Sequence, residues 1–388
     1  MSEYQYYEFL AVDRPLDERQ LGELRALSTR ARITPTSLVN TYHWGDFRGD
    51  PRKLMERYFD AFLYLANWGT HQLMLRLPAR LLDLETAARY CVGEPATSWA
   101  KGDHVILGLV SQDDSGDWAE GGEEQLASII PARAELASGD LRLLYLAWLL
   151  CAQSGELEDD VAEPPVPPGL QTLTASLHSF ADFLRIDDDL VAVAATASER
   201  SAPDDTSQAD LVRWIEGLPV AEKNALLLRV AHGDDAHVRM ELLRRFRDEH
   251  RAPSEAAPGS RTVGELLEAA QIRRAEREAV EAAQREQERA RRERAAATAR
   301  EKHLNKLAAD EEYAWQRVSV SLDTKKPTEY DKAVELLVDL RAVAERKNRI
   351  DVFERRFAQL RQQHLRKPSL LQRFDRARLT PAAVEHEG

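Results

Sequence analysis

The chain has 388 residues, of which 43% are apolar and 31% charged, with a formal net charge of −13. These values are typical of a soluble protein of two or three domains. A membrane span is excluded because the longest apolar run, residues 143–152, is about half the length that a span requires.

The start of the chain and its cysteines indicate a cytoplasmic protein. Residues 1–10, MSEYQYYEFL, lack the basic region of a secretory signal. Cys91 and Cys151 lie in apolar surroundings without a pairing pattern, as reduced core cysteines do. Charge is uneven, since residues 101–210 carry 22 acidic and 5 basic side chains, whereas residues 341–378 carry 12 basic and 4 acidic ones. The acidic middle and basic end could attract each other or meet different partners.

Residues 1–125 predict a small α/β domain with about four strands. The expected strands cover residues 4–12, 37–47, 70–78 and 103–111. The expected helices follow Asp17, which forms a capping box with Gln20, and Asp50, which precedes Pro51 and begins a helix through residue 67. A short helix at residues 84–91 completes this domain.

Residues 126–255 predict a helical domain. Helical spacing of apolar residues recurs in segments 138–155, 170–186, 187–198, 208–218, 220–231 and 235–250. The proline-rich segment 163–169 connects two of them, and residues 252–260 form a second linker.

Residues 263–318 predict one long charged helix. Residues 280–302 contain no Leu, Ile, Phe or Met, so a coiled-coil seam is missing. Charge pairs at helical spacing are present instead, such as Glu281 with Arg285 and Glu288 with Arg292. We expect a lightly packed strut between packed ends. The alternative is a disordered charged linker.

Residues 328–380 predict a helical hairpin similar to one tetratricopeptide-type helix pair. Apolar stripes run from Tyr330 to Ala344 and from Ile350 to Leu360. The hairpin also carries a basic face, which we expect to bind a protein partner or nucleic-acid phosphates. Its residues are Arg355, Arg356, Arg361, Arg366, Lys367, Arg373, Arg376 and Arg378. A solvated helix face is the alternative reading of this charge.

Two clusters have metal-ligand residue types. They are His43 with Asp46 and Asp50, and His232 with Asp235 and His237. In both, glycines and helix-capping aspartates also explain the pattern as turns. We therefore expect no metal and no cofactor.

The common catalytic and nucleotide-binding motifs are absent from the sequence. An enzyme remains an alternative, and it would be centred on His43, His71 or Asp46 near the strand ends. That reading requires a concave pocket that joins these residues.

Two stretches resemble known proteins. The segments YYEFLAVDRPL, ITPTSLVNTYHWGDFRGD and YFDAFLYLANWGTH resemble an uncharacterised family of bacterial proteins, which implies no activity. Residues 335–379 are similar to the helical ends of bacterial proteins that carry SWIM zinc fingers. The zinc-binding cysteines and histidine of that motif are missing here, so the resemblance implies a shared helical docking module without zinc.

Taken together, these patterns predict an α+β, mainly helical protein. We expect a non-enzymatic adaptor that joins protein partners without a membrane. A nucleic-acid-associated protein is the first alternative, and the oligomeric state stays open.

Overall fold

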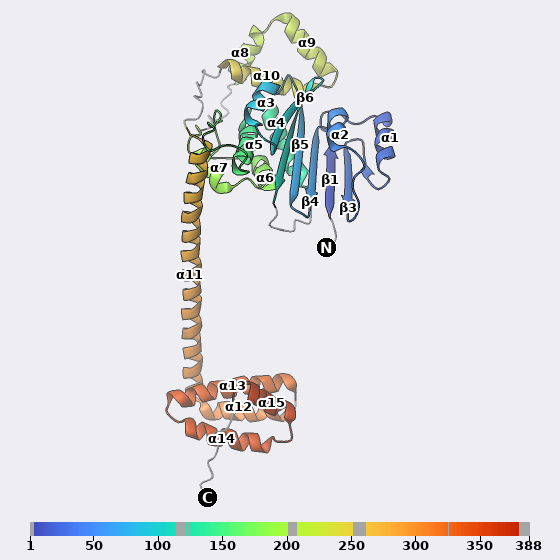
Figure 1. Cartoon of the computed structure of the whole chain (residues 1–388). Coiled ribbons are helices and arrows are strands. Elements are labelled where there is room, and N and C mark those ends of the chain that lie inside the picture. Colours follow the sequence, from blue (N-terminus) through green and yellow to red (C-terminus); the bar gives the residue numbers. More distant parts are fainter. Residues whose placement is uncertain are drawn as a thin grey trace. The chain divides into compact units, whose positions relative to one another are not determined.

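The computed structural model describes residues 4–113, 122, 124–200, 208–250, 261–324 and 326–379. The chain divides into two compact units, Met1–Arg277 and Glu278–Gly388. The described residues form fifteen helices and one seven-stranded sheet, which lies in the first unit (Figure 1). The predicted fold class, α+β and mainly helical, is confirmed.

The sheet of the first unit is antiparallel, with strand order β2-β3-β1-β4-β5-β7-β6. In chain order the strands are β1 (Gln5–Leu10), β2 (Arg32–Ile33), β3 (Ser37–Tyr42), β4 (Ala61–Ala66), β5 (Thr70–Pro78), β6 (Ala96–Lys101) and β7 (His104–Gln112). The sequence predicted only β1, β3, β5 and β7.

The helix predicted through residue 67 is wrong in its second half. Helix α2 (Pro51–Arg57) begins at the expected cap, where the Asp50 side chain accepts a hydrogen bond from the Lys53 amide. It ends at Tyr58, and β4 follows. Because β4 is buried on both faces, its apolar run lacks the alternation that marks a half-exposed strand.

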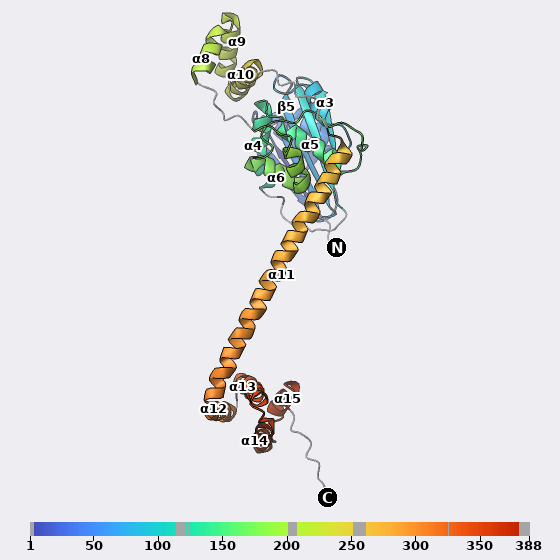
Figure 2. The same ribbon diagram turned by 90° about the vertical axis from the view of Figure 1, so that its left-hand side faces the viewer.

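Each face of the sheet has its own core. On one face, Phe9, Phe62 and Met74 pack with α1 (Glu18–Leu27) and α2. On the other, leucines such as Leu63 and Leu75 pack with helices that include α3 (Leu84–Tyr90), α4 (Gln125–Ala137), α5 (Arg142–Gln153), α6 (Ala175–Phe183) and α7 (Asp188–Ala195). Figure 2 shows α4, α5 and α6 in front of the sheet. The boundary predicted at residue 125 therefore does not separate two cores.

Three further helices of the first unit form a small module, which we call the α8–α10 module. They are α8 (Gln208–Gly217), α9 (Val220–Ala231) and α10 (Asp235–His250). Leu226, Val238 and Phe246 are its buried apolar side chains. Trp214 joins them through an edge-on ring contact with Phe246.

Helix α11 (Val263–Ala309) begins in the first unit and ends in the second. From residue 271 to residue 303 every side chain is exposed except the half-buried Ala290. Among the described residues, no helix combines the length and the apolar content needed to cross a membrane. The predicted end at residue 318 is wrong, because Asp310 leaves the helical conformation and its side chain caps α12 by accepting from the Tyr313 amide.

The second unit contains the C-terminal helices α12 (Glu311–Asp323), α13 (Pro327–Arg346), α14 (Ile350–Gln363) and α15 (Pro368–Arg376). The predicted hairpin corresponds to α13 and α14, and Asn348 turns between them with a φ of 54°. Its two apolar stripes pack together, but they share one core with α12 and α15 through residues such as Trp315, Leu370 and Phe374. The hairpin is thus part of a larger helical unit.

Candidate interaction surfaces

The predicted basic face lies on α14 and α15, whose apolar sides are fixed by Phe353, Phe357 and Phe374 in the core. This packing leaves the basic side chains at the surface of the second unit. Their ion pairs divide them into two groups, those with an internal partner and those without one among the described residues.

Arg356 joins two helices at the surface of the second unit. Both of its terminal nitrogens donate to Glu312 of α12, each at 2.6 Å. Its guanidinium also lies 4.7 Å from the centre of the Trp315 ring. A bidentate ion pair combined with a cation–π contact fixes α14 on α12. The neighbouring Arg355 only pairs with Asp351 one turn earlier and is 75% exposed.

Three other basic residues of the predicted face also have internal partners. Arg361 donates to Asp375 of α15 at 2.8 Å, and Arg373 of α15 donates to Asp331 of α13 at 2.6 Å. Lys367 donates to the Leu322 carbonyl at 2.9 Å. These three side chains connect neighbouring segments of the helical unit. This part of the predicted basic face therefore stabilises the fold.

Arg366, Arg376 and Arg378 are exposed, and their side chains have no ion pair within the described part of the chain. Arg366 precedes α15, while Arg376 and Arg378 lie at its end. The basic surface that remains available is therefore much smaller than the sequence indicated. We call these three residues the free basic surface.

His43, Asp46 and Asp50 make separate contacts in the structure. Asp50 caps α2, whereas Asp46 accepts a hydrogen bond from the Gln5 side chain at 3.1 Å. The exposed His43 ring lies 5.7 Å from the ring of Tyr4. No group of three potential metal ligands of the His, Cys, Asp or Glu type occurs within the residues that the structure describes.

His71 is buried on β5, where its contacts are with Phe183 and Arg185. Its ring stacks on Phe183, with Nδ1 2.6 Å from the Phe183 carbonyl oxygen and Nε2 3.0 Å from an Arg185 nitrogen. Burial lowers the pKa of His71, and the nearby Arg185 charge lowers it further. His71 shares no hydrogen-bond partner with His43 or Asp46 among these contacts.

His232, Asp235 and His237 also lie in different surroundings. His232 and Asp235 are exposed, whereas His237 is largely buried between Asp234 and Asp13. Asp13 comes from the loop after β1, more than two hundred residues earlier in the chain. Sequence reasoning missed this contact because nothing near Asp13 marks it as a partner for α10.

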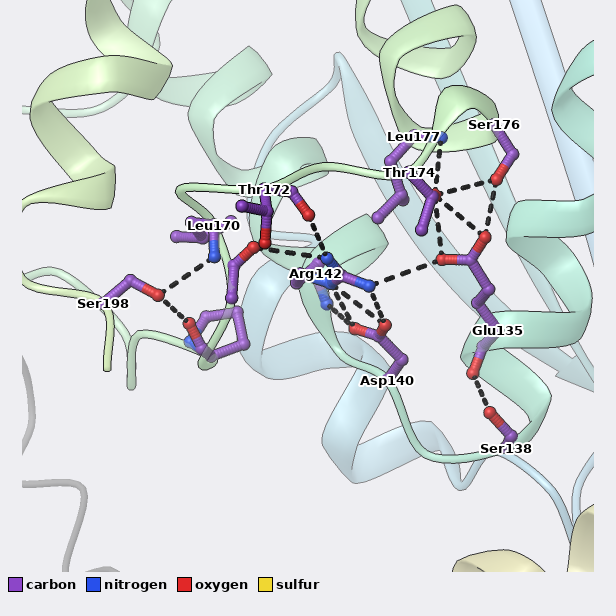
Figure 3. A network of polar contacts seen from close by, with 12 residues as sticks. Glu135, Ser138, Asp140, Arg142, Leu170, Thr172, Thr174, Ser176, Leu177 and Ser198 are labelled. Carbon is purple, nitrogen blue, oxygen red and sulfur yellow. Dashed lines mark hydrogen bonds and ion pairs between the residues drawn. The ribbon is translucent and has the colours of Figure 1, made fainter. Parts of the chain in front are cut away.

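A polar network joins the turn between α4 and α5 to the segment before α6 (Figure 3). Arg142 pairs with Asp140 at 2.6 Å and donates to the carbonyls of Gly169 and Thr172. Glu135 accepts from the hydroxyls of Thr174 and Ser176. Because these groups bond to one another, the network holds the loops around α6 in place.

A second network fixes the start of α11. Arg261 donates twice to the buried Glu163, which also accepts from the Tyr145 hydroxyl. Burial and the Glu163 charge raise the pKa of Tyr145. About three and four turns into the helix, Arg273 and Arg277 pair with the buried Asp189 of α7. The beginning of α11 is thus tied to the first unit by several charged contacts.

The apolar side of α9 is the most exposed apolar surface of the α8–α10 module. Val220, Leu227 and Leu228 are 71%, 66% and 60% exposed. Clusters of large exposed apolar side chains are typical of protein-binding surfaces. The sequence predicted this helix but gave no indication that its apolar residues stay uncovered.

The surface of the described residues includes two open depressions. One, at the start of α11, is lined by Arg261, Glu265, Glu268, Ala269 and Ile272. The other, in the second unit, is lined by Arg300, Val334, Glu335, Val338, Asp339 and Ala377. Neither contains His43, His71 or Asp46, the residues that the enzyme alternative requires.

Comparison of the chain with protein-family models, with curated proteins and with solved structures finds no match.

Proposed function

We propose that this protein is a non-enzymatic adaptor, in which the first unit binds one protein partner and the C-terminal helical unit binds another. The observation that carries the proposal is the middle of α11, where residues 271–303 are exposed apart from Ala290. This stretch contributes no side chain to either core, so we infer that it serves to connect the two units, each of which has a core.

Helix α11 has the local chemistry to remain helical without packing. Glu288 pairs with Arg292 as the sequence predicts, and Arg289 pairs with Glu293. Each exposed pair contributes about 0.2–0.5 kcal/mol, and alanine, glutamate and arginine are good helix formers. These small terms support a helical connection rather than a disordered linker.

The candidate contacts for the two partners differ in chemistry. In the first unit, the exposed Leu227 and Leu228 of α9 suit an apolar partner surface. In the second, the free basic surface suits an acidic one. Because most of the predicted basic face is paired internally, nucleic-acid binding becomes the weaker reading, since it depends on free charge.

The test is a pull-down of the tagged full chain from its native host, with and without nuclease, read by quantitative mass spectrometry. The first variant is Leu227→Gln/Leu228→Gln, and the second is Arg366→Glu/Arg376→Glu. An adaptor predicts that each variant loses a different set of partners and that both sets survive nuclease.

Matched controls change the same chemistry on α11. Val280→Gln alters an apolar side chain that is 56% exposed, and Arg291→Glu/Arg294→Glu reverses two exposed charges. Both controls should retain all partners. Loss of every partner after nuclease, or loss of one identical set in both test variants, would contradict the adaptor proposal.

A further inference from the structure

His237 has a carboxylate at each ring nitrogen. Its Nε2 lies 3.0 Å from an oxygen of Asp13, and its Nδ1 lies 2.7 Å from an oxygen of Asp234. Asp234 belongs to the α8–α10 module, whereas Asp13 belongs to the loop between β1 and α1. The ring therefore bridges the module and the sheet.

This geometry favours a protonated ring. A neutral imidazole has one N–H and one lone pair, so in either tautomer one carboxylate oxygen would face a lone pair. The imidazolium donates from both nitrogens and satisfies both carboxylates. In agreement, the hydrogen bond with Asp13 raises the pKa of His237 above its ordinary value, and Asp234 raises it further.

The groups around the bridge are charged and paired. Arg133 of α4 donates to Asp13 at 2.7 Å, while Arg229 of α9 donates to Asp234 at 2.8 Å. Arg80, after β5, also donates to Asp234 and lies 3.6 Å from Glu241 of α10. Burial raises the pKa of Asp13, but His237 and Arg133 outweigh it and hold the pKa well below its usual value.

His104 of β7 is a second histidine that interacts with the Asp13 charge. Burial lowers the pKa of His104, and the Arg76 charge lowers it further. His104 therefore loses its proton at a lower pH than His237 does. Within this group of contacts, His237 is the histidine that keeps its charge above about pH 6.5, the pKa of an undocked imidazole.

The contacts that hold the module on the sheet are largely polar. Besides the His237 bridge and the Arg80 contacts, Arg244 of α10 donates to the Leu81 carbonyl and lies 3.5 Å from Asp83. Met240 adds a partly buried apolar contact. An interface of this kind depends strongly on each ionic bridge, because little apolar area compensates for a lost one.

We propose that the α8–α10 module is held on the sheet by a pH-sensitive latch, in which the imidazolium of His237 joins Asp13 to Asp234. A group whose pKa is raised in the docked state stabilises docking below its undocked pKa. That contribution disappears as the pH rises through the docked pKa. The latch is thus closed in mildly acidic solution and weakens as the pH rises above about 6.5.

The experiment is hydrogen exchange by mass spectrometry on the full chain, from about pH 6 to about pH 8.5, corrected for intrinsic exchange. The readout is the protection of α10 and of residues 79–83. In the wild type, protection should fall with rising pH. The opening constant should rise tenfold for each unit by which the measured His237 pKa exceeds that of an undocked imidazole.

The variant His237→Gln keeps one donor but cannot gain charge, so its exchange should not change with pH. The control His232→Gln, which alters an exposed histidine of the same module, should behave as the wild type. An NMR titration of the histidines in the wild type gives the His237 pKa without any substitution. A His237 pKa at or below that of His232, or a pH response that persists in His237→Gln, would overturn the latch.

Discussion

Asp60 is a buried carboxylate, 1% exposed, whose two oxygens accept four hydrogen bonds. Two come from the Arg76 guanidinium, and two from the amides of Val12 and Asp13. Arg76 itself is buried and also donates to the Met55 carbonyl. The pair ties the end of α2 to β5 and to the loop that follows β1.

We expect Asp60→Asn to destabilise the first unit by about 3–5 kcal/mol, because the substitution leaves the Arg76 charge buried without its partner. Asp103→Asn changes an exposed carboxylate and should stay within about 0.5 kcal/mol. Urea unfolding of both variants measures the difference. Equal midpoints would show that the buried pair contributes nothing.

Arg355 and Arg356 provide a second comparison of neighbouring residues. Arg356→Ala removes the contact with Trp315, which should cost about 0.5–1 kcal/mol in the second unit. Arg355→Ala removes only a pair within one exposed turn, so little change is expected. Thermal unfolding followed by circular dichroism distinguishes them. A larger loss in Arg355→Ala would contradict the structural assignment of Arg356.

At the level of elements, the start of α11 depends on α7. Asp189 is buried and pairs with Arg273 and Arg277, whereas the adjacent Asp188 is exposed. Asp187 caps α7 and also pairs with Arg274. One short helix therefore presents two carboxylates to three arginines of α11.

Asp189→Asn should weaken these charged hydrogen bonds by about 1–3 kcal/mol and lower the protection of residues 263–277 from hydrogen exchange. Asp188→Asn keeps the same position in the chain without these contacts, and it should leave protection unchanged. If both variants exchange alike, the ion pairs do not hold the start of α11.

The elements that the sequence predicted have strong local signals. The capping box of Asp17 and Gln20 is present, as are the Asp50 cap and the exposed charged stretch of α11. The sequence did not predict β4 and β6, because the order of apolar and polar residues in these strands also fits a helix or a loop. The turns at Trp68–Gly69 and Gly102–Asp103 could have indicated both hairpins, since Gly69 and Gly102 adopt positive φ values.

The basic face was harder to predict than these elements, because a sequence does not show which carboxylate each arginine will contact. Glu312 and Asp331 lie 44 and 42 residues from the arginines that they bind. Only the packing of α12 and α13 against α14 and α15 brings them together. For the same reason the sequence could not reveal that Asp13 meets His237.

At the scale of the whole molecule, the two units have separate apolar cores. That of the second unit consists of side chains from α12 to α15 and the segments beside them. Two-state unfolding is expected of a chain whose single core forms cooperatively. Because this chain has a separate core in each unit, we do not expect it to unfold in one step.

We expect two unfolding transitions in scanning calorimetry. Asp60→Asn should lower the midpoint of only one transition, and Arg356→Ala that of only the other. A single transition with equal calorimetric and van't Hoff enthalpies would show that the two cores unfold together.

The exposed middle of α11 also gives trypsin a series of accessible arginines. Arg285, Arg289, Arg291, Arg292 and Arg294 are all exposed, and each is a potential trypsin site. A protease needs an extended backbone, so cleavage there requires the helix to open locally. The rate of nicking therefore reports how often this stretch unwinds, and a bound protein that covers it would slow the cut.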